Sequence, residues 1–166
     1  RKVLLTALIR GAFEYQGQKC SAASRAYIPE SIWNEIKDEM ISEIRSIKMG
    51  TVEDFTNFMN AVIDKNAFEN IKGYIEYAKN SSSAKIIVGG GCDDSEGYFI
   101  EPTVILTDDP KFKTMTEEIF GPVLTVYVYD DDKYEETLKL CDETSAYGLT
   151  GSIIAEDRNA IRKATD

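Results

Sequence analysis

Cys20 is the residue of this chain whose type and setting favour nucleophilic chemistry. It lies in residues 17–22 (GQKCSA), between an apolar segment and a predicted strand. A thiol beside a glycine and small side chains can meet a small substrate, and an ionised thiol is a strong nucleophile. The sequence contains no histidine, so neither a Cys–His nor a Ser–His pair can form. If Cys20 reacts, a group other than imidazole must transfer the protons.

Cys20 also has a simpler interpretation, as a small apolar residue of the core. The other two cysteines are expected to be inert. Cys92 lies in an acidic turn, where negative charge should raise the pKa of its thiol, and Cys141 lies on the apolar face of a predicted helix. Three cysteines without CxxC spacing predict free thiols in a reducing compartment and no zinc site.

The composition is that of a globular domain with a formal net charge of −10. Nucleic acids and anionic membrane surfaces attract proteins rich in Lys and Arg, so the charge argues against both partners. The sequence has no apolar run long enough to span a bilayer and no recognisable secretory signal. A chain of 166 residues fits one domain, and its first and last segments lack the expected caps, which predicts a piece of a longer protein.

Apolar periodicity predicts helices alternating with strands. We expect one helix between Ser31 as its N-cap and Gly50 as its stop, and a dominant strand at 123–129 (VLTVYVY). The remaining helices are expected at 3–13, 66–79, 114–119, 131–144 and 157–166, and the remaining strands at 24–28, 85–88, 98–107 (broken at Pro102) and 148–155. This order predicts an α/β fold with an open, mostly parallel sheet and helices on both faces.

Two further motifs have a functional and a structural interpretation. Gly89-Gly90-Gly91 could approach a phosphate, but no helix opens after it as the dinucleotide fingerprint requires, so a turn is favoured. The acidic run 130–132 could be imagined as a metal site. Because no other ligands are in register, we interpret it as negative charge at a helix N-terminus, and we expect no metal.

Four segments together resemble the aldehyde dehydrogenase superfamily. Residues 17–20 (GQKC) are similar to the nucleophile motif of that family, and 117–123 (EEIFGPV) to its most recognisable signature. Residues 97–103 (GYFIEPT) and 147–151 (YGLTG) resemble two further family segments in the same order. Within the family, the likeness is greatest to the branch that oxidises glutamate 5-semialdehyde, on residues 13–22, 92–95 and 126–134.

The resemblance implies oxidation of an aldehyde to an acid with a nicotinamide cofactor, NAD rather than NADP. Cys20 would add to the carbonyl to form a thiohemiacetal and then a thioester, with its own backbone N–H as one oxyanion donor. Ser21 would line the pocket for the α-carboxylate of the substrate, although it could equally bond local backbone. Glu118 would accept hydrogen bonds from the ribose hydroxyls, and Phe120 would pack beside the nicotinamide end.

Four neighbouring residues stay outside this predicted site. Lys19 is omitted because sequence neighbours on an extended chain often point in opposite directions. Glu117 is expected on the surface and Leu149 in a buried strand. The upstream general-base glutamate, the oxyanion asparagine, the dinucleotide-binding domain and the downstream substrate loop of the family have no match, so 1–166 is expected to be a partial catalytic domain, inactive alone.

Three alternatives remain open at this point. The protein could oxidise another aldehyde, could keep the fold as a non-catalytic interaction module, or could use Cys20 as a redox-sensing thiol. The reducing compartment would be the cytoplasm or the mitochondrial matrix. The complete protein is expected to form a homo-oligomer, while this piece alone could be monomeric.

Overall fold

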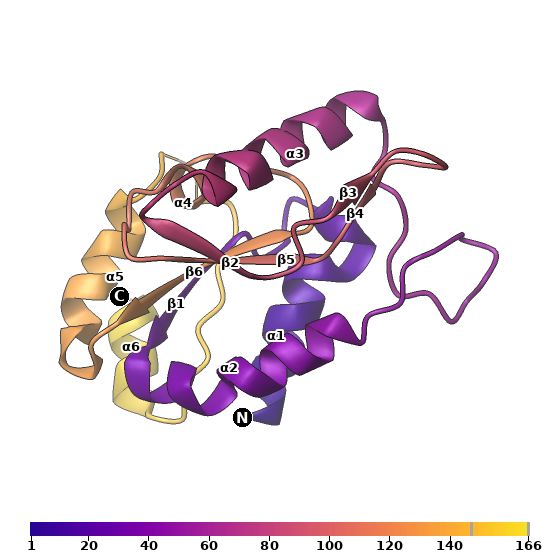
Figure 1. The fold of residues 1–166 in the computed structure, drawn as a ribbon. Coiled ribbons are helices and arrows are strands. Elements are labelled where there is room, and N and C mark those ends of the chain that lie inside the picture. Colours follow the sequence, from indigo (N-terminus) through magenta and orange to yellow (C-terminus); the bar gives the residue numbers. More distant parts are fainter. Residues whose placement is uncertain (147, 166) are drawn as a thin grey trace.

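The computed structural model describes residues 1–146 and 148–165 (Figure 1). Tyr147, which opens the fourth resembling segment, and Asp166, which ends the last predicted helix, lie outside the described residues. The helices are α1 (Lys2–Phe13), α2 (Glu30–Arg45), α3 (Lys65–Lys79), α4 (Lys113–Thr116), α5 (Tyr134–Glu143) and α6 (Arg158–Thr165), with short 3₁₀ turns η1 (Glu14–Gly17) and η2 (Asp131–Lys133). The strands are β1 (Arg25–Pro29), β2 (Ala84–Val88), β3 (Cys92–Asp93), β4 (Phe99–Ile100), β5 (Thr103–Thr107) and β6 (Val123–Tyr129).

The main sheet has the strand order β1-β6-β5-β2. The central strand β6 runs parallel to both neighbours, pairing Arg25 with Thr125 on one side and Thr103 with Val123 on the other. Only β2 runs antiparallel, beside β5. The predicted α/β architecture with a mostly parallel sheet is therefore confirmed.

Helices cover both faces of this sheet, as Figure 1 shows with α3 on one side and α1 and α2 on the other. Successive strand residues point to opposite faces, so Val104 and Leu124 join the core under α1 and α2, while their neighbours Ile105 and Val123 join the core under α3. All four residues are almost fully buried. Two apolar cores thus fix the sheet from above and below.

The predicted stripe of α3 is the best example of sequence periodicity giving local structure. Its apolar residues at helical spacing are buried against the sheet (Phe68, Ile71, Ile75 and Ala78). Asp64 is the N-cap before Lys65, and its carboxylate accepts the backbone N–H of Ala67 at 2.8 Å. The prediction of a helix over 66–79 is confirmed.

Several local predictions were wrong. Ser31 is not an N-cap, because α2 already begins at Glu30 after Pro29, and the helix ends at Arg45 rather than at Gly50. Residues 148–155 form no strand within the described part of the chain, and Leu149 is 79% exposed rather than buried. A strand needs a partner ladder as well as β-branched residues, and neither described sheet includes a strand paired with this segment.

Candidate functional site

The predicted site segments meet at one edge of the sheet because of strand direction. Residues 18–24 enter β1, residues 117–122 enter β6 and residues 97–102 enter β5. Since these three strands are parallel, their entering segments gather at the same edge. The antiparallel β2 ends there too, so the glycines at 89–91 belong to the same edge.

A tight reversal after α1 presents Cys20. Tyr15, Gln16 and Gly17 follow one another with φ of 56°, 57° and 65°, a left-handed run in which two members are not glycine. Such strained backbone is held only where the surroundings enforce it, and it concentrates at functional sites. A turn closed by the N–H of Ala22 donating to the carbonyl of Lys19 at 3.0 Å then follows.

Cys20 and Ser21 occupy the two central positions of this turn, and both are exposed. The interpretation of Cys20 as a buried core residue was therefore wrong. Among the described residues, the backbone N–H of Cys20 donates to no acceptor. The turn therefore offers a thiol and a backbone donor together on an open surface.

Gly17 brings the nucleophile loop against the 117–122 segment. A Cβ atom on Gly17 would lie 2.3 Å from the carbonyl oxygen of Gly121, so a side chain cannot fit between the two backbones. Cys20 is three residues from this contact on one chain segment, and Glu118 and Phe120 lie within three residues of it on the other. The contact places the two predicted motifs side by side.

Two glutamine side chains fasten the loop to a third segment. The Gln16 side chain donates to the carbonyl of Ala61 at 3.2 Å and accepts the N–H of Asn60 at 3.1 Å. The Gln18 side chain accepts the N–H of Ile63 at 2.9 Å. Sequence reasoning missed both, because neither partner lies within 40 residues and no local pattern marks a glutamine that bonds distant backbone.

Lys19 forms an ion pair with Glu14. Its ammonium group pairs with Glu14 Oε2 at 3.0 Å, and this contact, with Arg10 at the other carboxylate oxygen, holds the pKa of Glu14 below its ordinary value. The omission of Lys19 from the predicted catalytic set agrees with this geometry. The charge beside Cys20 in sequence is already engaged elsewhere.

The segment after α4 exposes Glu118 and Phe120 and buries the residue between them. Ile119 is only 2% exposed, whereas Phe120 is 43% exposed and has a left-handed φ of 56°. The next residues join the sheet, since the N–H of Thr103 donates to the carbonyl of Pro122 at 2.9 Å. Glu117 is on the surface as predicted, where it accepts the Tyr74 hydroxyl at 2.7 Å.

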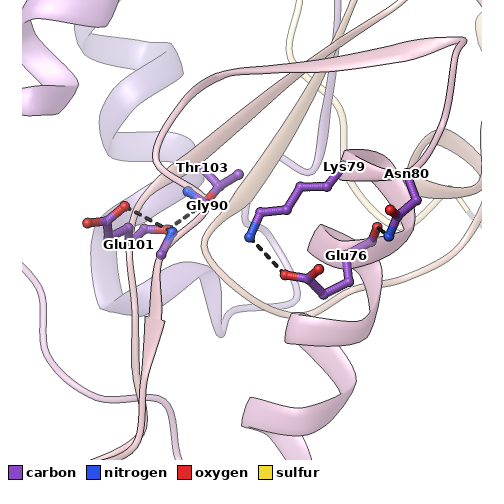
Figure 2. Close-up of polar contacts among 7 residues, drawn as sticks. Glu76, Lys79, Asn80, Gly90, Glu101 and Thr103 are labelled. Atoms are coloured by element: carbon purple, nitrogen blue, oxygen red, sulfur yellow. Dashed lines mark hydrogen bonds and ion pairs between the residues drawn. The ribbon is translucent and has the colours of Figure 1, made fainter.

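The three glycines at 89–91 link β2 to β3 and are hydrogen-bonded to residues 101–103 (Figure 2). The N–H of Gly90 donates to Thr103 Oγ1 at 2.9 Å, and the N–H of Gly91 donates to Glu101 Oε2 at 3.0 Å. Gly89 is required by its φ of 75° and by a Cβ position 2.2 Å from the carbonyl oxygen of Pro102. These N–H groups already have protein acceptors, which argues against a phosphate loop. The predicted turn was wrong, because β2 and β3 lie antiparallel to the successive strands β5 and β4, and the chain continues in one direction between them.

The other two thiols are half-buried. Cys92 lies in β3 rather than in a turn, and burial is the main cause that raises the pKa of its thiol. Burial likewise raises the pKa of Cys141, which packs near Tyr27 and Arg25. The predicted direction for Cys92 is confirmed, although negative charge from Glu76 and Glu101 is only a minor cause.

Neither a metal cluster nor a membrane helix is found in the described part of the chain. No group of three or more His, Cys, Asp or Glu side chains is placed there to hold a metal ion. Asp131, in the acidic run, instead accepts both the N–H and the hydroxyl of Ser31. None of the described helices combines the length and the apolar character needed to cross a bilayer.

A sequence profile described as the aldehyde dehydrogenase family matches residues 2–166. The chain belongs to the aldehyde dehydrogenase family. The resemblance inferred from the four segments is thereby confirmed. The match extends over nearly the whole chain, and it includes Cys20, Ser21, Glu118 and Phe120.

Curated relatives show which members of this family the chain is similar to. The chain is 64% identical over 156 residues to the mitochondrial delta-1-pyrroline-5-carboxylate dehydrogenase of Dictyostelium discoideum, covering 94% of this chain and 28% of that protein. It is 51% identical over 163 residues to the human protein of the same name, covering 98% of this chain and 29% of that one. The chain thus spans less than a third of these curated relatives.

Solved structures show the same likeness as the curated relatives. The delta-pyrroline-5-carboxylate dehydrogenase of Mycobacterium tuberculosis superimposes with a TM-score of 0.92 at 48% identity, over 99% of this chain and 30% of that one. A second structure of that enzyme, bound with NAD, gives a TM-score of 0.91 over 98% of this chain and 29% of that one. The fold of this chain therefore also occurs in an aldehyde dehydrogenase that binds NAD.

Proposed function

We propose that this chain is the nucleophile-bearing part of an NAD-dependent dehydrogenase that oxidises L-glutamate 5-semialdehyde to glutamate in proline catabolism. In this proposal, 1–166 is part of the catalytic domain of a longer protein. The observation that carries it is the exposed Cys20 on a loop whose Gly17 contacts Gly121, in the segment that carries the exposed Glu118 and Phe120. The names and the NAD-bound structure of the relatives supply the substrate and the cofactor.

The residues beside Cys20 fit the cofactor end of such a site. The exposed carboxylate of Glu118 can accept hydrogen bonds from two ribose hydroxyls at once. Phe120 offers a partly exposed aromatic surface against which a planar ring can pack. NAD, when bound there, supplies a hydride acceptor.

Cys20 performs the covalent step in this mechanism. Its thiolate adds to the aldehyde carbon to form a C–S bond, and the carbonyl oxygen becomes an oxyanion that the Cys20 backbone N–H can stabilise. Once the carbon has given up its hydride, a thioester remains on Cys20. Water then attacks the acyl carbon, the C–S bond breaks, and the acid leaves with the thiolate restored. Ser21, exposed next to the sulfur, would receive the α-carboxylate of the substrate.

Alkylation of the complete protein tests the assignment of Cys20. Iodoacetamide should modify Cys20 before Cys92 and Cys141, because the last two thiols are half-buried with raised pKa values. NAD together with aldehyde should protect Cys20 alone. Equal modification of the three cysteines, or no protection, would refute the role of Cys20.

Substrate comparison tests the branch of the family. The complete protein should oxidise glutamate semialdehyde faster than propanal at equal concentration. Faster turnover of propanal would mean a different aldehyde substrate. No turnover of any aldehyde, with reversible peroxide oxidation of Cys20 instead, would favour a redox-sensing thiol.

Location and assembly complete the proposal. The names of the human and Dictyostelium relatives include the word mitochondrial, so we place the complete protein in the mitochondrial matrix as a homo-oligomer. Fractionation and light scattering test the two statements separately. Recovery only in the cytosol, or a monomeric mass, would overturn the corresponding one.

A further inference from the structure

We infer that Tyr74 and Glu117 form a positioning pair that orients the Glu118–Phe120 segment for the cofactor. The inference rests on the proposed function, because Glu118 is the group that would contact the ribose. Glu117 itself points to α3 rather than to a ligand, since its Oε2 accepts the Tyr74 hydroxyl at 2.7 Å. The pair therefore acts through its neighbour in sequence.

The hydrogen bond is built to persist. Burial, followed by the contact with the Glu117 carboxylate, raises the pKa of Tyr74 to about 12, so the hydroxyl keeps its proton and remains a donor at neutral pH. The Lys113 ammonium lies 5.0 Å from the centre of the Tyr74 ring and 4.0 Å from Glu117 Oε2. Lys113 thus contacts both members of the pair, which limits the directions that the Glu117 side chain can take.

The same helix supports the far end of the segment. Ile71 lies one turn before Tyr74 on α3, and residues three apart share a helix face. A Cβ atom on Gly121 would lie 2.5 Å from Ile71 Cδ1, so Ile71 packs directly against that backbone. Tyr74 and Ile71 therefore hold residues 117 and 121, the two ends of a segment whose middle carries Glu118 and Phe120.

Strand β1, which follows the loop of Cys20, also holds the residues just before Glu117 in place. The Arg25 side chain, in β1, donates to the carbonyl of Met115 at 2.9 Å. Arg25 follows Cys20 by five residues, so the strand that leaves the nucleophile loop also anchors the residues before Glu117. Met115 stays fixed by Arg25, and Gly121 stays fixed by Ile71. Loss of the Tyr74 hydrogen bond should therefore free mainly the residues between them, which include Glu118.

The test is Tyr74→Phe in the complete protein. It removes one hydroxyl and keeps the ring that packs with Lys113. We expect KM and Kd for NAD to rise roughly three- to tenfold, because a hydrogen bond to a carboxylate is lost but only part of its free energy reaches the ribose contact. At saturating NAD, kcat should stay within about twofold, since no reacting atom is touched.

Tyr77→Phe is the matched control. Tyr77 lies one turn further along α3, and its ring also faces Lys113, but within the described residues its hydroxyl makes no hydrogen bond. This variant should leave the KM for NAD unchanged. An equal rise in both variants would overturn the inference, because it would trace the effect to α3 in general.

Variants of Glu117 separate orientation from stability. Glu117→Gln keeps an acceptor for Tyr74 and should restore most of the NAD affinity that Glu117→Ala loses. The double variant Tyr74→Phe/Glu117→Ala should bind NAD no more weakly than Glu117→Ala alone, because the two residues act through one bond. Additive losses would contradict the pairing.

Thermal unfolding provides the readout that distinguishes a merely structural role. A Tyr74→Phe variant with a lowered Tm and an unchanged KM for NAD would refute the inference while leaving the proposed function intact. A wild-type protein that binds NAD in no assay would instead refute the proposed function and the role of the pair together. The two failures are thus recognisable from the wild-type binding measurement.

Discussion

The Gly17 backbone touches the Gly121 backbone so closely that an added Cβ atom would stand 2.3 Å from the Gly121 carbonyl oxygen. Gly17 also has a φ of 65°, which residues with a side chain rarely adopt. Two requirements, space and backbone conformation, therefore coincide at a single position. The opposing atoms belong to the main chain, so they cannot turn aside as a flexible side chain could.

Gly17→Ala should accordingly lower the free energy of unfolding by about 2 kcal/mol or more, measured from the urea midpoint of the complete protein. It should also disturb Cys20, seen as slower alkylation. Gly73→Ala is the control, because Gly73 lies inside α3 with nothing within 4 Å of the added atom. That variant should gain about 0.5–1 kcal/mol from helix propensity. An unchanged free energy of unfolding in Gly17→Ala would contradict the close approach of Gly17 to Gly121.

Gln16→Leu should loosen the 60–63 segment. The substitution leaves the carbonyl of Ala61 and the N–H of Asn60 without the Gln16 side chain, which should cost about 1–3 kcal/mol. Hydrogen exchange gives the sharpest measurement: the Asn60 amide should exchange faster in this variant. The Ile63 amide, which donates to Gln18, should change much less. Equal acceleration at both amides would show that the two glutamines do not act separately.

Cys20→Ser should abolish aldehyde oxidation by the complete protein. An alcohol is a far weaker nucleophile than a thiolate near neutral pH, and removing a nucleophile lowers kcat by a factor on the order of a thousand or more. Cys92→Ser and Cys141→Ser should retain turnover. NADH formation is the readout, and a protein whose Cys141→Ser variant loses activity as completely would require a different nucleophile.

The alkylation rates of Cys92 and Cys141 should rise with pH only at values above those expected for an ordinary thiol. Burial raises the pKa of both thiols, and only the thiolate reacts, so their modification rates should level off at a pH above the ordinary thiol pKa. The measurement is the rate of iodoacetamide labelling against pH in the Cys20→Ser variant. Half-maximal rates at the ordinary thiol pKa would show that neither sulfur is shielded from water.

Ser31→Ala should weaken the folded protein near neutral pH but not in strong acid. The hydroxyl and N–H of Ser31 hold the pKa of Asp131 below its ordinary value, so this contact stabilises the fold above that value and is lost as pH falls through the lower folded-state pKa. Thermal midpoints of variant and wild type should therefore converge in acid. Asp132→Asn, next in sequence, should show no such convergence, since within the described residues Ser31 bonds Asp131 and the Asp132 carboxylate makes no hydrogen bond or ion pair with α2.

Elements whose structure follows from their local residue pattern could be predicted from the sequence. The run at 123–129 is strand β6, bounded as expected, because β-branched and aromatic residues suit a strand buried on both faces. The family motif at 17–20 predicted that Cys20 is exposed, whereas the general tendency of cysteine to be buried predicted the opposite. Residues 148–155 also contain β-branched residues yet form no strand in the described part of the chain, since propensity does not supply a paired neighbour.

Long-range contacts account for the rest. Ser31 was expected to cap its own helix, but its hydroxyl bonds a carboxylate 100 residues away. The left-handed conformations of Gln16 and Phe120 had no local signal, because neither is glycine. No local pattern distinguishes Tyr74 within the helix predicted at 66–79, and only the fold brings its hydroxyl to Glu117.

Each reactive segment enters its own parallel strand, at residues 18–24 for β1, 97–102 for β5 and 117–122 for β6. The strands themselves are fixed by the cores above and below them. A change of sequence in one connection need not displace the strand ladder, but the contact of Gly17 with Gly121 couples the connection before β1 to the one before β6. In the proposed function, the aldehyde would be received beside Cys20 and the coenzyme beside Glu118, on two different connections.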